Sequence, residues 1–218
     1  MDKEWKFMTL GVIFDMDGVL IDSESFYFDR RMQFFKEKNI VPGSTNKLDF
    51  VGLTENGIWE VLVAEKETRA ELKKEYHDYR KNHPIDFKKA LRKSVKEVLD
   101  YLKKEKTKIA LASSSPQSEI NEMLTHNNLT PYFDFVISGE ELTKSKPHPE
   151  IYQIAMDALG YENCMAVEDS PVGIASAKAA GLYTIALKQE LSLDQTQADI
   201  VIEELTDIFK IIEKVVYS

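Results

Sequence analysis

Short apolar runs alternate with amphipathic segments along most of the chain, and this alternation indicates its fold class. Leu10–Phe14 is almost continuously apolar, which is typical of a strand buried on both faces. The later runs of this kind are Lys108–Ala112, Phe133–Ile137, Cys164–Val167, Tyr183–Leu187 and Ile200–Ile202. Apolar residues at helical spacing lie between the runs, at Val95–Lys104, Ser118–His126, Ile151–Leu159, Ile174–Ala180 and Ile208–Val216. The regular order of strand and helix predicts an α/β fold, a doubly wound parallel sheet with helices on both faces.

One long segment interrupts this order. Residues from about 23 to 92 contain no convincing strand pattern. Helical patterns are found there at Phe26–Lys36, Gly57–Val63 and Arg69–Tyr79. The segment carries a net charge of +2, whereas the rest of the chain carries −11. We therefore expect an all-helical domain at 23–92 inserted into an α/β core domain formed by 1–22 and 93–218, although a solvated helical arm would show similar charge.

Composition excludes several classes of protein. Lys and Arg number 28 against 37 Asp and Glu, a net charge of −9, which does not suit nonspecific binding of nucleic acid or of a membrane surface. The single cysteine, Cys164, excludes an intramolecular disulfide and a cysteine-based zinc site. No apolar run approaches the roughly 20 residues that span a bilayer, and the first ten residues lack a signal-peptide pattern. We expect a cytoplasmic protein whose size and charge are compatible with a monomer.

Polar side chains follow the predicted strands at the points where the strands end. Ligands of open parallel sheets bind at the carboxyl ends of the strands, so these residues are candidates for a common site. The residues are Asp15, Asp17 and Gly18 after the first strand, Ser113, Ser114 and Ser115 after the second, Lys146 in the loop after the third, and Glu168 and Asp169 after the fourth. Each one alone could serve a turn or a helix cap. Together they predict a site at one edge of the sheet.

The charge of this predicted site requires a cation. Four carboxylates would bring up to −4 into a partly dehydrated crevice, with Lys146 as the evident counter-charge. Oxygen ligands favour a hard ion, and Mg²⁺ commonly binds carboxylates together with phosphate oxygens. An EF-hand does not fit the spacing, because Gly18 occupies the fourth position of the loop and Phe26 the twelfth. Neither standard glycine-rich nucleotide loop nor a Gly-x-Ser-x-Gly elbow is present.

The ordered motifs resemble those of the haloacid dehalogenase superfamily. The matching stretches are Asp15-Met-Asp-Gly-Val-Leu-Ile-Asp-Ser23, the strand-terminal Ser113, Lys146-Pro-His-Pro-Glu150 and Val167-Glu-Asp-Ser-Pro-Val-Gly-Ile174. The resemblance covers essentially the whole chain and implies a Rossmann-like core. The insertion is similar to the helical cap of the β-phosphoglucomutase-like phosphatase branch.

The resemblance also implies roles for single residues. Asp15 would be the nucleophile and Asp17 the general acid/base, while Ser113 and Lys146 would hold the transferring phosphoryl group. Gly18 and Ser114 would lie beside that group. Mg²⁺ would be held by Asp15, Asp17 and Asp169, and Glu168 is a further candidate ligand.

Several of these residues keep alternative interpretations. Ser114 and Ser115 either contact phosphate through their backbone or cap the helix that follows Pro116. Glu168 is either a metal ligand or a group that orients the ligands, and the second is favoured. Structural roles are favoured for Cys164 and for the aromatic residues of the insertion, Phe26, Tyr27, Phe34, Phe35 and Trp59.

We expect an Mg²⁺-dependent phosphatase acting on a small phosphorylated metabolite of the sugar or polyol class. A phosphosugar mutase is the main alternative, and a noncatalytic phosphate-binding protein or a dehalogenase is less favoured. Mutases of this branch carry a Gly-Val-Ser-Arg-like stretch whose arginine binds a second phosphate, but here the stretch is Gly52-Leu-Thr-Glu55. Tyr27 stands where those mutases have a histidine, and Lys47 or Lys81 could substitute for the missing arginine.

Overall fold

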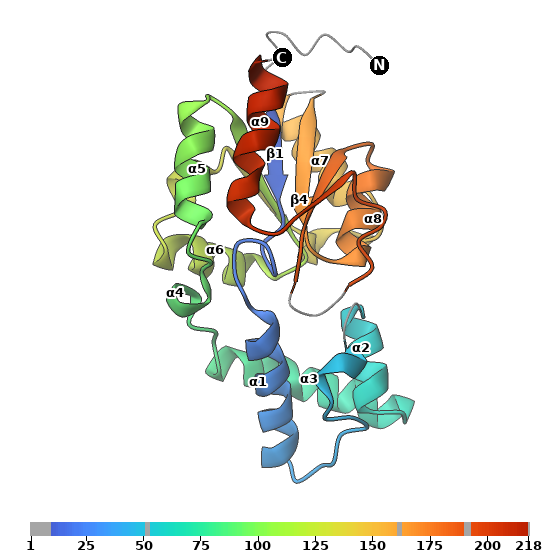
Figure 1. Ribbon diagram of the computed structural model, residues 1–218. Helices are drawn as coiled ribbons and strands as arrows, with labels where there is room; N and C mark the ends of the chain where they lie inside the picture. The colour runs from blue at the N-terminus through green and yellow to red at the C-terminus, as the bar shows by residue number, and fades with distance from the viewer. Residues whose placement is uncertain (1–9, 51–52, 161–162, 190–192, 218) are drawn as a thin grey trace. The chain divides into compact units, whose positions relative to one another are not determined.

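The computed structural model describes residues 10–50, 53–160, 163–189 and 193–217 (Figure 1). The chain divides into two compact units, one formed by Met1–Asp22 with Phe87–Ser218 and the other by Ser23–Asp86. We call the first the core unit and the second the insert unit. In the described part of the chain, none of the helices combines the length and the apolar character needed to cross a bilayer.

The core unit contains a parallel sheet. Its strands are β1 (Gly11–Phe14), β2 (Lys108–Ser113), β3 (Phe135–Ser138), β4 (Cys164–Glu168), β5 (Tyr183–Leu187) and β6 (Ile200–Ile202). Their order is β3-β2-β1-β4-β5-β6, and all neighbouring pairs are parallel. This is the Rossmann-type order, in which the chain reverses its direction of travel across the sheet beside β1. The predicted doubly wound α/β fold is confirmed.

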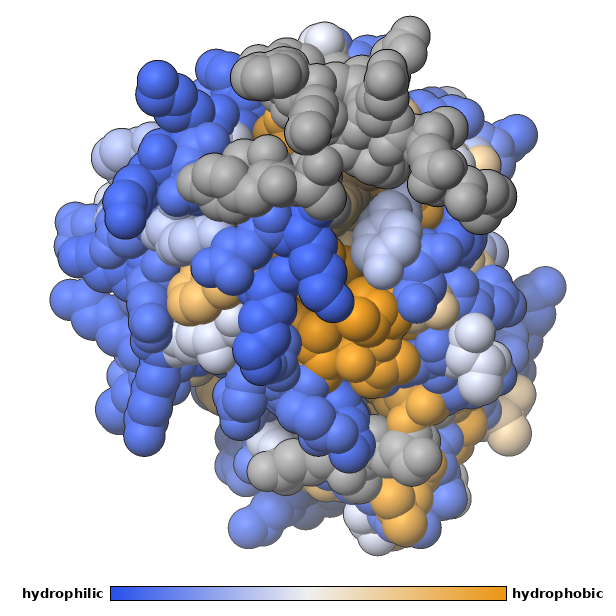
Figure 2. All heavy atoms as spheres, turned by 45° about the horizontal axis from the view of Figure 1, so that its top comes forward, coloured by the Kyte–Doolittle hydropathy of each residue, from blue (hydrophilic) through white to orange (hydrophobic). Residues whose placement is uncertain are grey.

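The helices of the core unit are α4 (Phe87–Ala90), α5 (Val95–Lys104), α6 (Gln117–His126), α7 (Glu150–Leu159), α8 (Pro171–Ala179) and α9 (Ile208–Tyr217). Of these, α5, α6, α7 and α8 contact the strands, and the short α4 contacts α6. On one face, α7 and α8 bury Ile13, Ala110 and Ala166 in a common apolar cluster. Strand side chains alternate between faces, so Val12 and Phe14 point to the opposite side, where α5 contacts α9 and β2. In the view of Figure 2 most of the coloured surface is hydrophilic, and apolar side chains gather near its centre.

The described residues of the insert unit form helices joined by loops, and none of them lies in a strand. The unit contains α1 (Glu24–Glu37), a 3-10 turn at Lys47–Phe50, α2 (Glu55–Leu62) and α3 (Lys66–Asn82). Its core contains Phe34, Phe35 and Trp59, each at most 1% exposed, as the structural interpretation of these aromatics predicts. The rings of Trp59 and Tyr76 have centroids 5.4 Å apart. Phe26 and Tyr27 are only half-buried, and both rings lie against the Arg30 guanidinium.

Residues 87–92, which the sequence pattern assigned to the insertion, group with the core unit. Phe87 is 1% exposed, and Leu91 forms an antiparallel bridge with Ile21. The N–H of Arg92 donates to the carbonyl of Leu20 at 3.0 Å. These backbone bonds hold the stretch against the segment that follows β1, so the insert unit ends at Asp86.

Candidate active site

Asp15 lies directly after the central strand. Its backbone N–H donates to the Val167 carbonyl at 2.9 Å, which extends the pairing of β1 with β4 by one residue. Its side chain is 10% exposed and accepts a hydrogen bond from Lys146 Nζ at 2.7 Å. Asp17 follows two positions later and is half-buried. Its Oδ2 accepts a hydrogen bond from Ser115 Oγ at 2.6 Å, so the loops after β1 and β2 are joined at this carboxylate.

Lys146 is the central cation of the site. It lies in the loop before α7, and only 7% of its side chain is exposed. Its ammonium group donates to Asp15 Oδ1 at 2.7 Å, to Glu168 Oε1 at 2.7 Å and to the Ala112 carbonyl at 3.1 Å. Burial alone would lower the pKa of Lys146, but the two carboxylates raise it above its ordinary value. The ammonium group is therefore held in its charged form.

Glu168 is fully buried, and both of its oxygens are hydrogen-bonded within the protein. Oε1 accepts from Lys146 and from Tyr152 Oη at 2.6 Å, while Oε2 accepts from the Asp169 N–H at 3.2 Å. The first turn of α8 lies against this carboxylate, since a Cβ at Gly173 would approach Oε1 to 2.0 Å. Both oxygens of Glu168 are thus engaged by neighbouring groups of the site, and its role as a ligand or an orienting group stays a prediction.

Tyr152 belongs to the site although the sequence analysis did not select it. It lies in the first turn of α7, is fully buried, and its hydroxyl donates to Glu168 while lying 3.3 Å from Lys146 Nζ. An apolar helix face was predicted here, and a tyrosine on such a face is usually a core residue. The one feature of the sequence that could have assigned Tyr152 to the site is its position, only six residues after Lys146.

The acidic residues form a group suited to a metal ion. Carboxylate oxygens of Asp15, Glu168 and Asp169 all lie within 4.8 Å of one another. Burial, opposed by Lys146 but reinforced by Glu168 and Asp17, raises the pKa of Asp15 to about 7. Burial and the charges of Glu168 and Asp15 raise the pKa of Asp169 well above its ordinary value. The negative charge thus exceeds what Lys146 balances, and a divalent cation fits the donor set.

The side chain of Asp17, also predicted as a metal ligand, is not part of this three-carboxylate group. The glycine that follows it lies very close to the group. Gly18 has a φ of +76°, and a Cβ there would lie 1.9 Å from Asp169 Oδ2. Glycine is therefore required for both the backbone conformation and the close approach of the two loops.

The three serines after β2 have different surroundings. Ser113 is fully buried, and its Oγ accepts from the Ser115 N–H at 3.1 Å. Ser114 is exposed. The helix α6 begins at Gln117, whose N–H donates to Glu140 Oε2 at 3.1 Å, so the capping role considered for Ser114 and Ser115 is not observed. The hydroxyl of Ser115 instead contacts Asp17, a contact that the sequence analysis did not predict.

In the insert unit, Glu55 is paired with an arginine that the sequence analysis overlooked. Arg31 Nη2 donates to Glu55 Oε2 at 2.6 Å, and Trp59 Nε1 donates to Oε1 at 2.9 Å. Burial raises the pKa of Glu55, but Arg31 and Trp59 more than offset this and hold it below its usual range. Two lysines were considered as substitutes for the arginine of the mutases. Lys47 donates to Ser25 Oγ at 2.9 Å, and Lys81 donates to Asp78 Oδ1 at 2.9 Å. Gly52 lies outside the described residues.

Comparison with known proteins identifies the family. Residues 12–187 match the family profile described as haloacid dehalogenase-like hydrolase. A phosphorylated carbohydrates phosphatase of Thermotoga maritima is 34% identical over 183 residues, with 80% of this chain and 82% of the relative covered. Hexitol phosphatase B of Escherichia coli K12 is 28% identical over 208 residues, covering 91% and 94%. The crystal structure of a β-phosphoglucomutase from Clostridium difficile superposes with a TM-score of 0.75 at 20% identity, covering 95% and 97% of the chains, which shows a shared fold. The chain belongs to the haloacid dehalogenase-like hydrolases.

Proposed function

We propose that this hydrolase is an Mg²⁺-dependent phosphatase that acts on a sugar or polyol phosphate through an aspartyl-phosphate intermediate. The observation that carries the proposal is the position of the Asp15 carboxylate, which contacts Lys146 at 2.7 Å and lies beside the Asp169 carboxylate at the end of the central strand. The names of the two relatives, a phosphorylated carbohydrates phosphatase and a hexitol phosphatase, support the substrate class.

In the first half of the proposed reaction, a carboxylate oxygen of Asp15 attacks the substrate phosphorus. The bond between phosphorus and the leaving oxygen breaks, and protonated Asp17 gives its proton to the leaving alkoxide. In the second half, water attacks the phosphorus of the aspartyl-phosphate while Asp17 takes a proton from that water. The bond from phosphorus to Asp15 breaks, and inorganic phosphate leaves.

The surrounding residues stabilise charge on the transferring group. Lys146 is held charged beside Asp15 and would interact with the equatorial phosphoryl oxygens. Ser113 accepts from the Ser115 N–H through its oxygen, so its own proton is available to a phosphoryl oxygen. Asp15 and Asp169 would hold Mg²⁺, oriented by Glu168. When bound, the cation would neutralise phosphoryl charge and the excess charge of the carboxylates.

The proposal is tested by measuring phosphate release from a panel of hexose, pentose and hexitol phosphates with Mg²⁺ and with excess chelator. We expect turnover of one or more of these substrates that is lost on chelation and restored by Mg²⁺. Full activity in excess chelator would contradict the metal assignment. Absence of phosphate release from every substrate, with phosphate binding retained, would favour a noncatalytic binding protein.

The mutase alternative requires a second phosphate-binding group that holds a bisphosphate while it reorients. The Gly52–Glu55 stretch ends in a carboxylate, and the neighbouring Arg31 is already bonded to that carboxylate at 2.6 Å. We therefore expect water to intercept the aspartyl-phosphate. With β-glucose 1-phosphate, Mg²⁺ and a trace of the 1,6-bisphosphate, free phosphate should exceed glucose 6-phosphate. Rapid formation of glucose 6-phosphate with little free phosphate would establish the mutase.

A further inference from the structure

The loop between β5 and β6 contacts the backbone of the candidate cation site. The sequence analysis assigned chemistry to residues after the first four strands but none to residues after the fifth. Gln195 lies in this loop and is 8% exposed. Its Nε2 donates one hydrogen bond to the Asp169 carbonyl at 2.6 Å and another to the Leu187 carbonyl at 2.9 Å. Both protons of the carboxamide are thus used to join the ends of β4 and β5.

The backbone around Gln195 is itself held by local hydrogen bonds. Asp194 Oδ1 accepts from the N–H of Thr196 at 3.1 Å and from its Oγ1 at 2.6 Å. On the other side, the N–H of Ala198 donates to the Gln195 carbonyl at 3.1 Å. Because these turns fix the backbone, little conformational entropy is lost when the side chain of Gln195 bonds to the two carbonyls.

Asp169 is fixed from both sides as a result. Its N–H donates to Glu168 Oε2 at 3.2 Å, and its carbonyl accepts from Gln195. Gly18 occupies the space beside its carboxylate, since a Cβ there would lie 1.9 Å from Oδ2. With the peptide groups on both sides of Asp169 fixed, the direction of its carboxylate is set by its two side-chain torsions.

We propose that Gln195 is a positioning residue for the cation site, which holds the Asp169 backbone so that its carboxylate points at the ion. The inference rests on the proposed function, because it takes Asp169 as a cation ligand. Outer residues that orient metal ligands typically contribute about 10–100-fold to metal affinity. Gln195 contacts no proposed reacting group, so its removal should weaken cation binding more than it changes the chemistry at saturating Mg²⁺.

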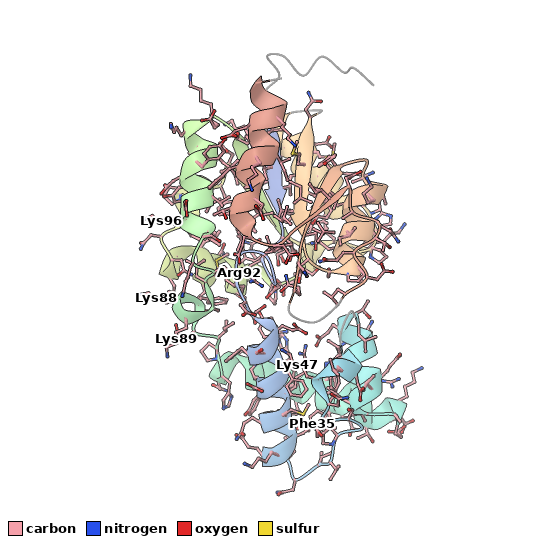
Figure 3. All side chains as sticks on the ribbon, in the orientation of Figure 1. Phe35, Lys47, Lys88, Lys89, Arg92 and Lys96 are labelled. Carbon is pink, nitrogen blue, oxygen red and sulfur yellow. The ribbon has the colours of Figure 1, made fainter. Side chains whose placement is uncertain are left out.

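A second glutamine in the same loop provides a matched comparison. Gln189 Nε2 donates to the same Leu187 carbonyl at 3.2 Å, but its other hydrogen bond goes to the Gly18 carbonyl at 2.9 Å. Its Oε1 accepts from Arg92 Nη2 at 2.8 Å, and Arg92 follows α4 (Figure 3). Gln189 therefore shares the loop and one acceptor with Gln195 but does not contact Asp169.

The test measures Mg²⁺ binding without substrate, by titration calorimetry and by the Mg²⁺-dependent rise in Tm, for the wild type, Gln195→Met and Gln189→Met. Methionine keeps the length of the side chain and removes both donors. We expect the Kd for Mg²⁺ to rise roughly tenfold or more in Gln195→Met and much less in Gln189→Met. The Tm in chelator, which reports loss of loop anchoring, should fall in both variants. At saturating Mg²⁺, kcat of Gln195→Met should remain near that of the wild type.

Equal Kd values for Mg²⁺ in the wild type and Gln195→Met would overturn the inference. An equal rise of the Kd in Gln195→Met and Gln189→Met would also overturn it, because the effect would then belong to the loop as a whole. If Gln195→Met does not fold, Gln195→Glu, which replaces the donating amide with a carboxylate, is compared in its place. Failure of the proposed function is distinguishable, because the wild type itself would then bind no Mg²⁺ or release no phosphate.

Discussion

Asp15→Asn is expected to lower kcat by more than about 10⁴-fold, a rise of about 5.5 kcal/mol in the activation barrier at about 1.4 kcal/mol per decade. The substitution keeps the size of the side chain and an oxygen that can accept from Lys146, which lies 2.7 Å from Asp15 Oδ1. It removes the anionic oxygen that would attack phosphorus, and no covalent intermediate could then form. Single-turnover assays with the preferred substrate measure the loss.

The fold of this variant should be intact, as near-UV circular dichroism and Tm can show. Asp157→Asn is a matched control, because Asp157 is an exposed aspartate on α7, and the same chemical change there should leave turnover unaltered. Activity of Asp15→Asn within about tenfold of the wild type, a barrier difference of only about 1.4 kcal/mol, would remove covalent catalysis by Asp15 from the mechanism.

Lys146→Met is expected to impair both stability and turnover. Lys146 is 7% exposed and bonds to two carboxylates, Asp15 and Glu168, that are 10% and 1% exposed. Removing one member of such a buried group leaves the opposite charge uncompensated and typically costs about 3–5 kcal/mol of folding free energy. Loss of a charge-stabilising donor should also lower kcat by about 10²–10³-fold. Urea unfolding in chelator and steady-state kinetics measure the two effects.

The double variant Lys146→Met with Glu168→Gln separates these effects. Neutralising Glu168 removes one of the two buried negative charges, Asp15 and Glu168, that lose their counter-charge in Lys146→Met. The free energy of unfolding should therefore recover in part relative to Lys146→Met alone. Turnover should not recover, since no cation replaces Lys146 at the phosphoryl group. Recovery of turnover together with stability would mean that Lys146 serves the fold and not the reaction.

The alternation of buried strands and amphipathic helices was sufficient to predict the sheet. The helix at Val95–Lys104 was predicted with the bounds that the structure shows, because its apolar positions face one side and polar residues flank it. Other boundaries differ by a few residues, as for α8, which begins at Pro171 and not at Ile174. Its first turn is fixed by the Ser170 side chain, which accepts from the Gly173 N–H, and not by apolar spacing.

Residues that act through tertiary contacts were not found from the sequence. Gln195 contacts Asp169, and Ser115 contacts Asp17, across large separations in the chain. Glutamine and serine are common on surfaces and in loops, so neither stands out without the fold. The motif residues could be predicted because the proposed reaction requires a carboxylate, a hydroxyl or an ammonium group at each of their positions. The Asp169 carbonyl requires only a hydrogen-bond donor of suitable length, so nothing in the sequence points to Gln195.

The chain leaves the core unit and returns to it at one place. Ile21 and Leu91 form a bridge, and the Asp22 N–H donates to the Ala90 carbonyl at 2.8 Å. Between these points the insert unit has an aromatic core built from its own residues. Because the two ends of the insertion lie side by side, a change in its length raises the entropic cost of closing the loop between β1 and β2 only slowly. An insertion of different length or sequence at this junction could therefore be exchanged in evolution without changing the register between β1 and β2.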